Sequence, residues 1–488
     1  MLAQGVCVCK VGREESAVMS SVDPTNPMNM PPGLLTRLAD YVYFQSYLPN
    51  QSIANFAAIA WLSGVAGRAY NTYTDAGLNQ YMLMLARTGI GKDEIAKGNS
   101  RLFAAIQRTV PAAVDFKGPG ELVSSAGLIK WLERKPCVLS MVGEFGLLMQ
   151  QMAANNANAN LKGLQRTLLQ LYSKSGIGDT FDAIAYSDKE KNTAVLDWPS
   201  LTLVGESVPD SFYESLDESM ISSGLLPRFM VFEYTGERPY SNADRQIEPC
   251  PQFVQELADF AGQCLNLMHL KQVVRVPADG AAQAFLDAFG DGECRDAMEG
   301  AGEVVRHLWN RAHLKALKLA TLSAVSRVPY NPTVCRDDAI WAVSLVRSQT
   351  ERLVGKFERD EVGTVDGDEG KQLAELIKAI GRYYGCRFDE LSGYGGFTQD
   401  MHRDGVITET FLSRFVTKRA AFRNDKRRGP TEALKRALNN LLIGDELREI
   451  PRAQMLAKYG NQSRGFVVSN PQRFAAARRA ELDASEYG

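Results

Sequence analysis

Short apolar runs alternate with amphipathic segments between about Tyr81 and Tyr234. Short apolar runs bounded by turn residues are typical of buried strands, and amphipathic segments are typical of helices that cover a sheet. This alternation predicts an α/β fold with mostly parallel strands. The four predicted strands are Tyr81–Leu85, Val138–Val142, Leu201–Val204 and Phe229–Phe232.

Helical spacing of apolar residues marks the segments on both sides of this core. Two helices are predicted between Pro31 and Leu62, before the first strand. The first thirty residues have neither a helical nor an alternating period and are interpreted as a mobile tail. The helices predicted to form a lid after the core are Phe253–His269, Ala281–Phe289, Glu303–Ser326 and Asp337–Phe357.

A second folded region follows the segment Glu358–Gly370, which is rich in acidic residues and glycine and is therefore interpreted as a solvated linker. Beyond the linker, the pattern predicts three helices and then a small hairpin around a Gly-containing turn. This order indicates a winged-helix-like domain. The helices are Leu373–Tyr384, Thr410–Phe422 and Thr431–Ile443, and the strands are Arg448–Pro451 and Phe466–Ser469.

The turn after the first strand has the features of a phosphate-binding loop. A strand, a Gly-containing turn with a lysine, and a helix together aim backbone N–H groups at a phosphate. Gly89 and Gly91 would allow close approach of the backbone, and Lys92 would reach the β and γ phosphates of ATP. The residues predicted to bind the nucleotide are Thr88, Gly89, Ile90, Gly91, Lys92 and Asp93.

Two replacements in this site suggest an altered magnesium contact. In the pattern G-x-x-x-x-G-K-[ST], Ala86 replaces the first glycine and Asp93 replaces the hydroxyl that usually touches Mg²⁺. The second strand runs into Gly143 and Glu144, where Glu144 fits a Walker B carboxylate that positions the attacking water. Because Gly143 stands where an aspartate is usual, Asp93 is predicted to hold the metal instead. The alternative is that Mg²⁺ is held through water and Asp93 caps its helix.

Two further positions are candidates for sensing the nucleotide. The third strand ends in Glu206 and Ser207, and a polar side chain there would face the γ phosphate; Ser207 is the first choice and Glu206 the second. The alternative is that both residues merely begin the next helix. Arg228 heads the fourth strand, where a core strand needs no charge, and it fits an arginine finger presented to the neighbouring subunit. A surface salt bridge is the alternative.

With these residues in place, the chain from about Pro31 to Leu353 resembles a family of phage and prophage ATPases described as primase/helicase-like, domain of unknown function 3987. In related oligomeric ATPases a lid arginine acts as a second sensor, so the resemblance makes Arg311 the matching candidate. Gly143 departs from the commoner Asp-Glu pair. The resemblance rests on the segments Pro31–Leu34, Leu78–Tyr81, Thr88–Asp93, Val142–Gly146, Leu203–Pro209, Gly224–Phe229 and Trp309–Ala320.

Charge is nearly balanced overall but uneven along the chain. The formal net charge of the 488 residues is −2, so a nucleic acid would have to bind to a local patch of basic residues. Nine basic residues lie between Arg414 and Arg436 against two acidic ones, which is the footprint of phosphate contacts, although a solvated helix face is the alternative. The residues predicted to bind DNA there are Arg423, Lys426, Arg427 and Arg428.

A second DNA contact is predicted inside the ATPase core. Thr180–Trp198 reads as a hairpin with a charged turn, and in ring helicases a basic hairpin of this kind lines the pore. Lys189 and Lys191 are therefore candidates for gripping single-stranded DNA, and a solvated turn is the alternative.

Cysteine usage and hydropathy point to a cytoplasmic protein, in the bacterial host if the chain is phage-encoded. The eight cysteines are scattered and complete no zinc site, as expected of reduced thiols in a cytosol. No stretch approaches the roughly 20 apolar residues that a membrane span needs, so no membrane partner is expected.

These features predict a ring-forming, ATP- and Mg²⁺-dependent DNA helicase that replicates a phage or mobile element, with DNA and possible other replication proteins as partners. A helicase loader or replication initiator is the alternative enzyme, and a DNA-binding regulator that holds ATP without hydrolysing it is the non-enzyme alternative. The predicted domains are a tail (1–30), a helical element (31–78), a P-loop core (79–245), a lid (246–357), a linker (358–370), a winged-helix-like domain (371–470) and a tail (471–488).

Overall fold

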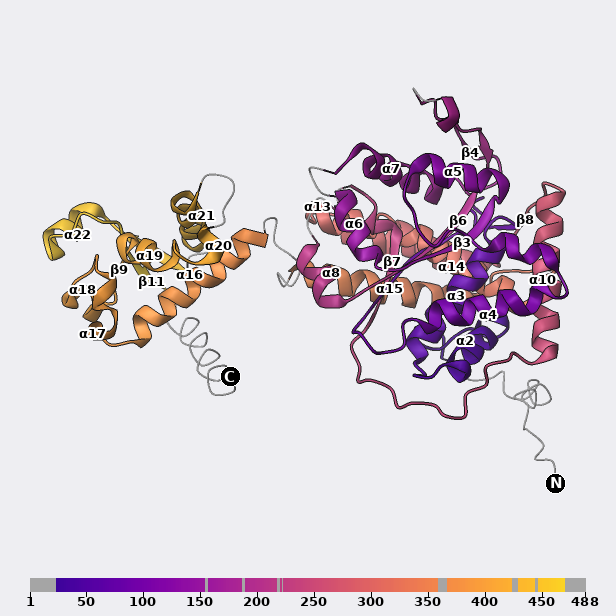
Figure 1. Ribbon diagram of the computed structural model, residues 1–488, viewed down its shortest axis with the longest axis horizontal. Coiled ribbons are helices and arrows are strands. Elements are labelled where there is room, and N and C mark those ends of the chain that lie inside the picture. The colour runs from indigo at the N-terminus through magenta and orange to yellow at the C-terminus, as the bar shows by residue number, and fades with distance from the viewer. Residues whose placement is uncertain are drawn as a thin grey trace. The chain divides into compact units, whose positions relative to one another are not determined.

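The structure of the protein is a computed structural model that describes residues 23–469, except 154–156, 187–188, 217–219, 222, 359–366, 424–428 and 444–445. The chain divides into two compact units, Met1–Val362 and Gly363–Gly488 (Figure 1). Their boundary falls within the segment interpreted as a linker, 358–370. The predicted C-terminal tail, 471–488, lies outside the described residues.

A four-stranded parallel sheet forms the centre of the first unit (Figure 1). Its strand order is β3-β6-β2-β7. Each strand contains one of the predicted apolar runs, so the prediction of an α/β core with parallel strands is confirmed. Because the strands are parallel, their carboxyl ends meet at one edge, where ligands bind in open α/β sheets. The strands are β2 (Tyr81–Ala86), β3 (Cys137–Val142), β6 (Ser200–Ser207) and β7 (Phe229–Tyr234).

Helices cover both faces of this sheet. The ring of Phe232 packs against Phe56 of α3 (Gln51–Ala66), with centroids 5.1 Å apart, and that of Phe229 packs against Phe145 of α6 (Phe145–Ala153) at 5.2 Å. Side chains alternate along a strand, so residues three apart point to opposite faces. Helices α3 and α6 therefore lie on opposite faces of the sheet.

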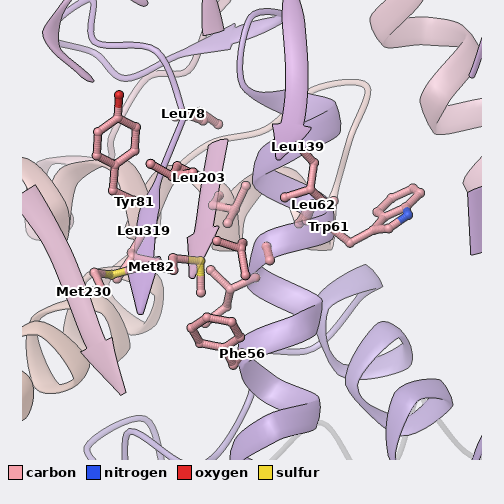
Figure 2. Packing of buried hydrophobic residues seen from close by; sticks show 14 of the residues in the cluster. Phe56, Trp61, Leu62, Leu78, Tyr81, Met82, Leu139, Leu203, Met230 and Leu319 are labelled. Carbon is pink, nitrogen blue, oxygen red and sulfur yellow. The ribbon is translucent and has the colours of Figure 1, made fainter. Parts of the chain in front are cut away.

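The face under α3 is closely packed. Figure 2 shows Phe56, Trp61 and Leu62 of α3 beside strand residues that include Leu139. A Cβ added to Gly64 would lie 2.6 Å from the Cβ of Leu139, so the helix and β3 approach as closely as a glycine permits. The N-terminal helices are thus part of the same core as the sheet.

The predicted N-terminal tail is only partly outside the described residues. Residues 1–22 are not described, whereas Met30 is buried and the Met28 carbonyl accepts a hydrogen bond of 2.9 Å from Asn55 Nδ2 on α3. Apart from α3 and α6, the helices that the structure describes in the first unit are α2 (Leu34–Gln45), α4 (Glu94–Gln107), η2 (Pro111–Phe116), α5 (Ser125–Arg134), α7 (Ala159–Ser173), η3 (Lys189–Lys191), α8 (Pro209–Ser215), η4 (Leu226–Arg228), α10 (Pro251–His269), α11 (Gly280–Asp287), η5 (Ala288–Cys294), α12 (Arg295–Met298), α13 (Glu303–Trp309), α14 (Ala312–Arg327) and α15 (Arg336–Glu358).

Two short strand pairs extend the first unit. β1 (Tyr70–Asn71) runs parallel to β8 (Val274–Arg275), so the chain after α3 is tied to the chain after α10. β4 (Thr180–Phe181) pairs antiparallel with β5 (Leu196–Asp197), which is the hairpin predicted over Thr180–Trp198.

The second unit packs its helices around a separate buried cluster and a three-stranded antiparallel sheet of order β10-β11-β9. Its described elements are α16 (Gly367–Gly385), α17 (Phe388–Leu391), η6 (Ser392–Tyr394), α18 (Gln399–Arg403), β9 (Ile407–Thr408), α19 (Glu409–Val416), α20 (Ala420–Arg423), α21 (Pro430–Ile443), β10 (Leu447–Ile450), α22 (Arg452–Tyr459) and β11 (Gly465–Val468).

The predicted hairpin of the second unit is present, with two differences from the expectation. β10 pairs antiparallel with β11, but the connection between them contains the helix α22 in addition to the Gly-containing turn that the sequence predicts. The helix predicted over Thr410–Phe422 is divided into α19 and α20. The division lets both Phe415 and Phe422 enter the buried cluster.

Candidate active site

The loop between β2 and α4 is accessible at Gly89 and packed against the rest of the chain at Gly91. Gly89 and Gly91 have φ angles of +79° and +94°, a conformation that favours glycine. A Cβ added to Gly91 would lie 2.9 Å from the Leu48 carbonyl oxygen, whereas one added to Gly89 would meet nothing within 4 Å. The chain between α2 and α3 therefore supports the loop at Gly91, and the backbone around Gly89 is accessible to a ligand.

Lys92 reaches from this loop to the neighbouring strand. Its Nζ donates a hydrogen bond of 3.1 Å to the carbonyl oxygen of Ser207, at the carboxyl end of β6. Burial raises the pKa of Glu206; Lys92 opposes that rise, and the charges of Glu144 and Asp93 add to it. These four charged groups therefore interact at one edge of the sheet.

Glu206 and Ser207 point to opposite faces of β6, as alternation along a strand requires. Glu206 lines a small pocket together with Lys92, Asp93 and Gly143. The hydroxyl of Ser207 lies on the other face, where a Cβ added to Gly146 would be 2.4 Å from it. Ser207, the first choice as sensor, thus offers its carbonyl to Lys92, and Glu206 presents the side chain to the pocket.

Glu144 follows β3 in a backbone conformation that is unusual for its residue type. Its φ angle is +47°, in the left-handed region that non-glycine residues rarely occupy, and its side chain is exposed. Strain of this kind persists where the surrounding structure enforces it and clusters at active sites. A Cβ added to the preceding Gly143 would meet nothing within 4 Å, so there is space for a side chain beside Glu144.

Asp93 does not cap α4. Its side chain makes no hydrogen bond to the backbone at the start of the helix and instead pairs with Lys97 one turn later. The next residue, Glu94, is 3% exposed and accepts a hydrogen bond of 3.1 Å from Gln45 Nε2 of α2. Sequence reasoning missed Glu94, which joins the first turn of α4 to the N-terminal helices.

The carboxylates fit a metal that the nucleotide itself would help to bind. Within the described ranges, no group of three or more His, Cys, Asp or Glu residues could hold a metal ion. Mg²⁺ is usually held by one or two carboxylates together with substrate phosphates and water. Asp93, with Glu144 and Glu206 in electrostatic range, matches that smaller requirement.

Arg228 lies at the opposite edge of the sheet from Lys92. It precedes Phe229, which pairs with Tyr81 at the start of β2. The pairing extends over the six residues of β2, so Arg228 is roughly 17–20 Å from the loop at about 3.3 Å per residue. The Arg228 Nη1 donates a hydrogen bond of 2.6 Å to the Gly224 carbonyl, and the guanidinium lies 5.9 Å from the centroid of the Tyr172 ring. It therefore has no contact with the loop between β2 and α4.

Arg311 lies with Arg228 rather than with Lys92. Burial lowers the pKa of Arg228, and the charge of Arg311 lowers it further, so the two guanidinium groups are close enough to repel. Arg311 directly precedes α14, whose Lys315 and Lys318 are buried beside the same strand ends. The sequence signal for this cluster is the spacing of four and three residues, which places all three cations on one helix face.

The predicted DNA-binding residues are only partly described. Lys189 and Lys191 are exposed in η3, between the hairpin strands β4 and β5. Arg423 is exposed at the end of α20. Lys426, Arg427 and Arg428 lie outside the described residues.

No protein-family model and no curated protein matches the chain. The resemblance to the phage and prophage ATPases therefore stays an expectation. One of the solved structures that match is the Aeropyrum pernix ORC2 protein in its ADPNP-ADP complexes, with 14% identity, coverage of 95% of this chain and 98% of that chain, and a TM-score of 0.22. That TM-score is too low to support an argument about fold or function.

Within the described residues, every helix is too short or too polar to cross a membrane.

Proposed function

We propose that the chain is an ATP-hydrolysing, ring-forming DNA helicase or translocase that acts in the replication of a phage or mobile element. The observation that carries the proposal is the meeting of Lys92, Asp93, Glu144 and Glu206 where the glycine loop and the parallel strands end. An open glycine loop before a helix binds phosphate through backbone N–H groups, with Lys92 as a point charge on the β and γ phosphates. Thr88, Gly89, Ile90 and Gly91 complete the cradle.

Hydrolysis is assigned to groups around this cradle. Glu144 is assigned to orient the attacking water, and Asp93 would hold Mg²⁺, which would neutralise charge on the phosphates when bound. Glu206 is the polar side chain best situated to sense the γ phosphate, with the Ser207 carbonyl fixing Lys92 before the nucleotide arrives. Gly143 leaves the space next to Glu144 open.

The ring is proposed because Arg228 lies too far from its own loop to serve it, roughly 17–20 Å away at about 3.3 Å per residue. Arg311 lies close enough to Arg228 for the two charges to repel. A permanently charged planar group at that distance can reach a nucleotide only in an adjacent subunit. Both arginines are therefore assigned to the neighbour's γ phosphate.

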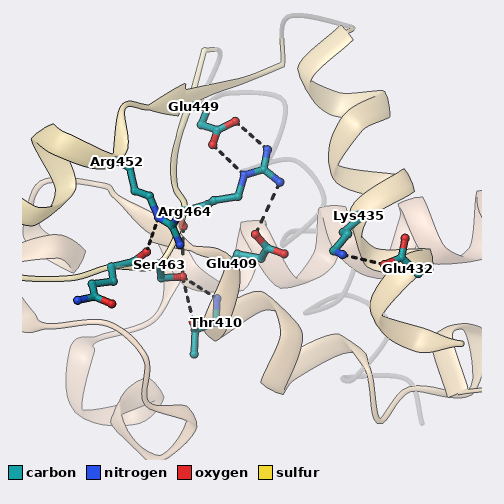
Figure 3. Close-up of polar contacts among 9 residues, drawn as sticks. Glu409, Thr410, Glu432, Lys435, Glu449, Arg452, Ser463 and Arg464 are labelled. Atoms are coloured by element: carbon teal, nitrogen blue, oxygen red, sulfur yellow. Dashed lines mark hydrogen bonds and ion pairs between the residues drawn. The ribbon is translucent and has the colours of Figure 1, made fainter.

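The second unit is proposed to be a winged-helix-like DNA-binding domain. Its order of α16, β9, α19, α21, β10 and β11, with β9 beside β11, supports this assignment. Figure 3 shows Arg464 of β11's leading turn paired with Glu449 and Glu409, which joins the hairpin to the start of α19. Arg423 and the neighbouring Lys426, Arg427 and Arg428 are proposed to contact DNA phosphates, and Lys189 and Lys191 to contact single-stranded DNA in the ring.

The test is steady-state ATP hydrolysis with and without single-stranded DNA, followed by strand displacement on a forked duplex. Stimulated hydrolysis and displacement are expected. Lys92→Ala should abolish turnover without changing the melting temperature, whereas Arg108→Ala, an exposed cation at the far end of α4, should not. DNA-stimulated hydrolysis without displacement would indicate a loader or initiator. ATP binding without turnover would indicate a regulator and contradict the proposal.

A further inference from the structure

Helix α14 carries two lysines in positions that a packed helix normally gives to apolar residues. Lys315 is 6% exposed and Lys318 is 1% exposed. Within the described residues, neither side-chain amine forms an ion pair with a carboxylate. Burying an amine is costly unless it is hydrogen-bonded, so the hydrogen bonds that these groups make must account for their position.

Both lysines fasten α14 to the amino edge of the sheet. Lys315 Nζ donates to the carbonyl oxygen of Phe229, the first residue of β7, at 2.6 Å. Lys318 Nζ donates to the side-chain and backbone oxygens of Asn79 at 2.6 and 3.2 Å, and to the carbonyl of Tyr172 at 3.3 Å. One helix of the lid region is thus bonded to the starts of β7 and β2 and to the end of α7.

The bond from Lys315 is next to Arg228 in the chain. Arg228 ends the short helix η4, and Phe229 directly follows it. Helix α13 contacts η4, and the Arg228 guanidinium lies 5.9 Å from the centroid of the Tyr172 ring. The turn that carries Arg228 is therefore in contact with α13, and the residue that follows it is hydrogen-bonded to α14.

Arg311 adds a constraint of its own. It precedes Lys315 by one helical turn, and its charge repels that of Arg228. The hydrogen bond from Lys315 to Phe229 is one of the contacts that hold α14 and β7 together against this repulsion.

We infer that Lys315 is a positioning residue for Arg228: through the Phe229 carbonyl it fixes the start of β7 and the direction in which Arg228 faces the neighbouring subunit. The lid helix α14 thereby controls hydrolysis in the next subunit of the ring. The inference rests on the proposed function, in which Arg228 acts on a neighbour's nucleotide.

The test is a set of mixing experiments with Lys315→Met, which keeps most of the length of the buried side chain and removes the donor. Alone, this variant should bind ATP with an affinity within about twofold of wild type, because its own site is distant. Its turnover should fall by about 10- to 100-fold, the size of effect that misplacement of a catalytic group produces.

Mixed oligomers then identify the side of the interface that is defective. Lys315→Met mixed with Glu144→Gln should recover activity, because the Glu144→Gln subunit supplies an intact arginine to the intact site of its neighbour. Lys315→Met mixed with Arg228→Ala should recover none, because both variants lack the same contribution. Arg228→Ala mixed with Glu144→Gln is the reference and should recover.

Each result bears on a different claim. If the reference mixture recovers and the mixture of Lys315→Met with Glu144→Gln does not, the inference is overturned and the assignment of Arg228 stands. If the reference mixture fails although mixed oligomers form, the assignment of Arg228 in the proposed function fails and the inference fails with it. If Lys315→Met does not fold, the same mixtures are made with Lys315→Leu, which also removes the donor and has a shorter side chain.

Thr321→Val is the matched control on the same helix. Thr321 is 1% exposed, and its hydroxyl donates to the Leu317 carbonyl within α14. It should hydrolyse ATP like the wild type. A loss equal to that of Lys315→Met would show that any disturbance of α14 suffices and would overturn the inference.

Discussion

Glu144 has a strained backbone and a proposed catalytic side chain. Different substitutions at this position can therefore separate the effect of the strain on stability from the effect of the carboxylate on ATP hydrolysis. A non-glycine residue at φ +47° costs on the order of 1–3 kcal/mol. Glu144→Gly should therefore raise the free energy of unfolding by up to about 2 kcal/mol after the entropic cost of the added glycine is subtracted. It should also abolish ATP hydrolysis.

The matched variant is Glu144→Gln, which keeps the strain and loses the carboxylate. It should lose hydrolysis without gaining stability. Denaturant unfolding and steady-state turnover measure the two effects. If Glu144→Gly is less stable than the wild type, the backbone at position 144 is not strained. If either variant keeps the wild-type rate of ATP hydrolysis, the Glu144 carboxylate has no catalytic role.

The roles of Asp93 and Gly143 can be tested as a pair. If Asp93 supplies the metal contact that Gly143 lacks, Asp93→Ala should increase severely the Mg²⁺ concentration needed for turnover. Adding Gly143→Asp should restore part of the activity, since a side chain at Gly143 meets nothing within 4 Å of its Cβ. The measurement is turnover as a function of Mg²⁺ concentration. Equal loss in the single and double variants would show that the metal is held through water.

At the residue scale, the sequence identifies charged side chains that stand next to glycine or apolar residues, where a charge is unusual. A lysine in a glycine loop and a glutamate after an apolar strand are visible in the sequence, and Lys92 and Glu144 both lie at the carboxyl edge of the sheet. Glu94 and Lys315 were missed because charged residues on an amphipathic helix are expected to face solvent. Their burial depends on the neighbouring helices and strands, and no local pattern encodes those contacts.

Helices and strands were predictable where a buried face requires apolar residues at regular spacing in the sequence. The four parallel strands are buried on both faces and read as continuous apolar runs, so their positions followed from the sequence. β9 has only two residues, and Met455 is the buried residue of α22. Neither element therefore contains enough buried residues to give a recognisable spacing of apolar positions in the sequence. Those elements are defined by pairing with β11 and by the hairpin geometry of the second unit.

The buried face of α14 predicts an unusual pH dependence of stability. Burial, together with the charges of Arg311 and Arg228, lowers the pKa of Lys315 from 10.5 to about 7. Burial and the charge of Arg228 lower that of Lys318 to about 7, while Asp179 opposes the shift. Between pH 7 and 10.5 the unfolded chain binds more protons at these lysines than the folded chain. Their contribution to stability therefore rises with pH across that window.

The measurement is the free energy of unfolding of the full chain between pH 7 and 9.5, below the range in which ordinary tyrosines ionise. Stability should increase with pH in the wild type, and the slope should be smaller in the double variant Lys315→Met, Lys318→Met. Thr321→Val should keep the wild-type slope. The same slope in the wild type and the double variant would contradict this assignment.

At the scale of the whole molecule, the chain combines two compact units with different chemistry. The first, Met1–Val362, contains the candidate active site, and the second, Gly363–Gly488, contains the basic segment 414–436. Each unit has its own buried cluster. Loss of DNA binding in the second unit should therefore leave ATP binding in the first unchanged.

The basic segment should supply much of the DNA affinity that does not depend on sequence. Each phosphate contact adds about 0.9 to the negative slope of log affinity against log salt on duplex DNA, and about 0.7 on single strands. Changing Arg423, Lys426, Arg427 and Arg428 together to Ala should weaken binding and flatten that slope by about two to four units. The measurement is DNA binding across a salt series, with ATP affinity measured in parallel and Lys189→Ala, Lys191→Ala as the comparison variant. If the slope is unchanged in the quadruple variant and flattened in the comparison variant, the hairpin of the first unit makes the phosphate contacts, and 414–436 is a solvated face.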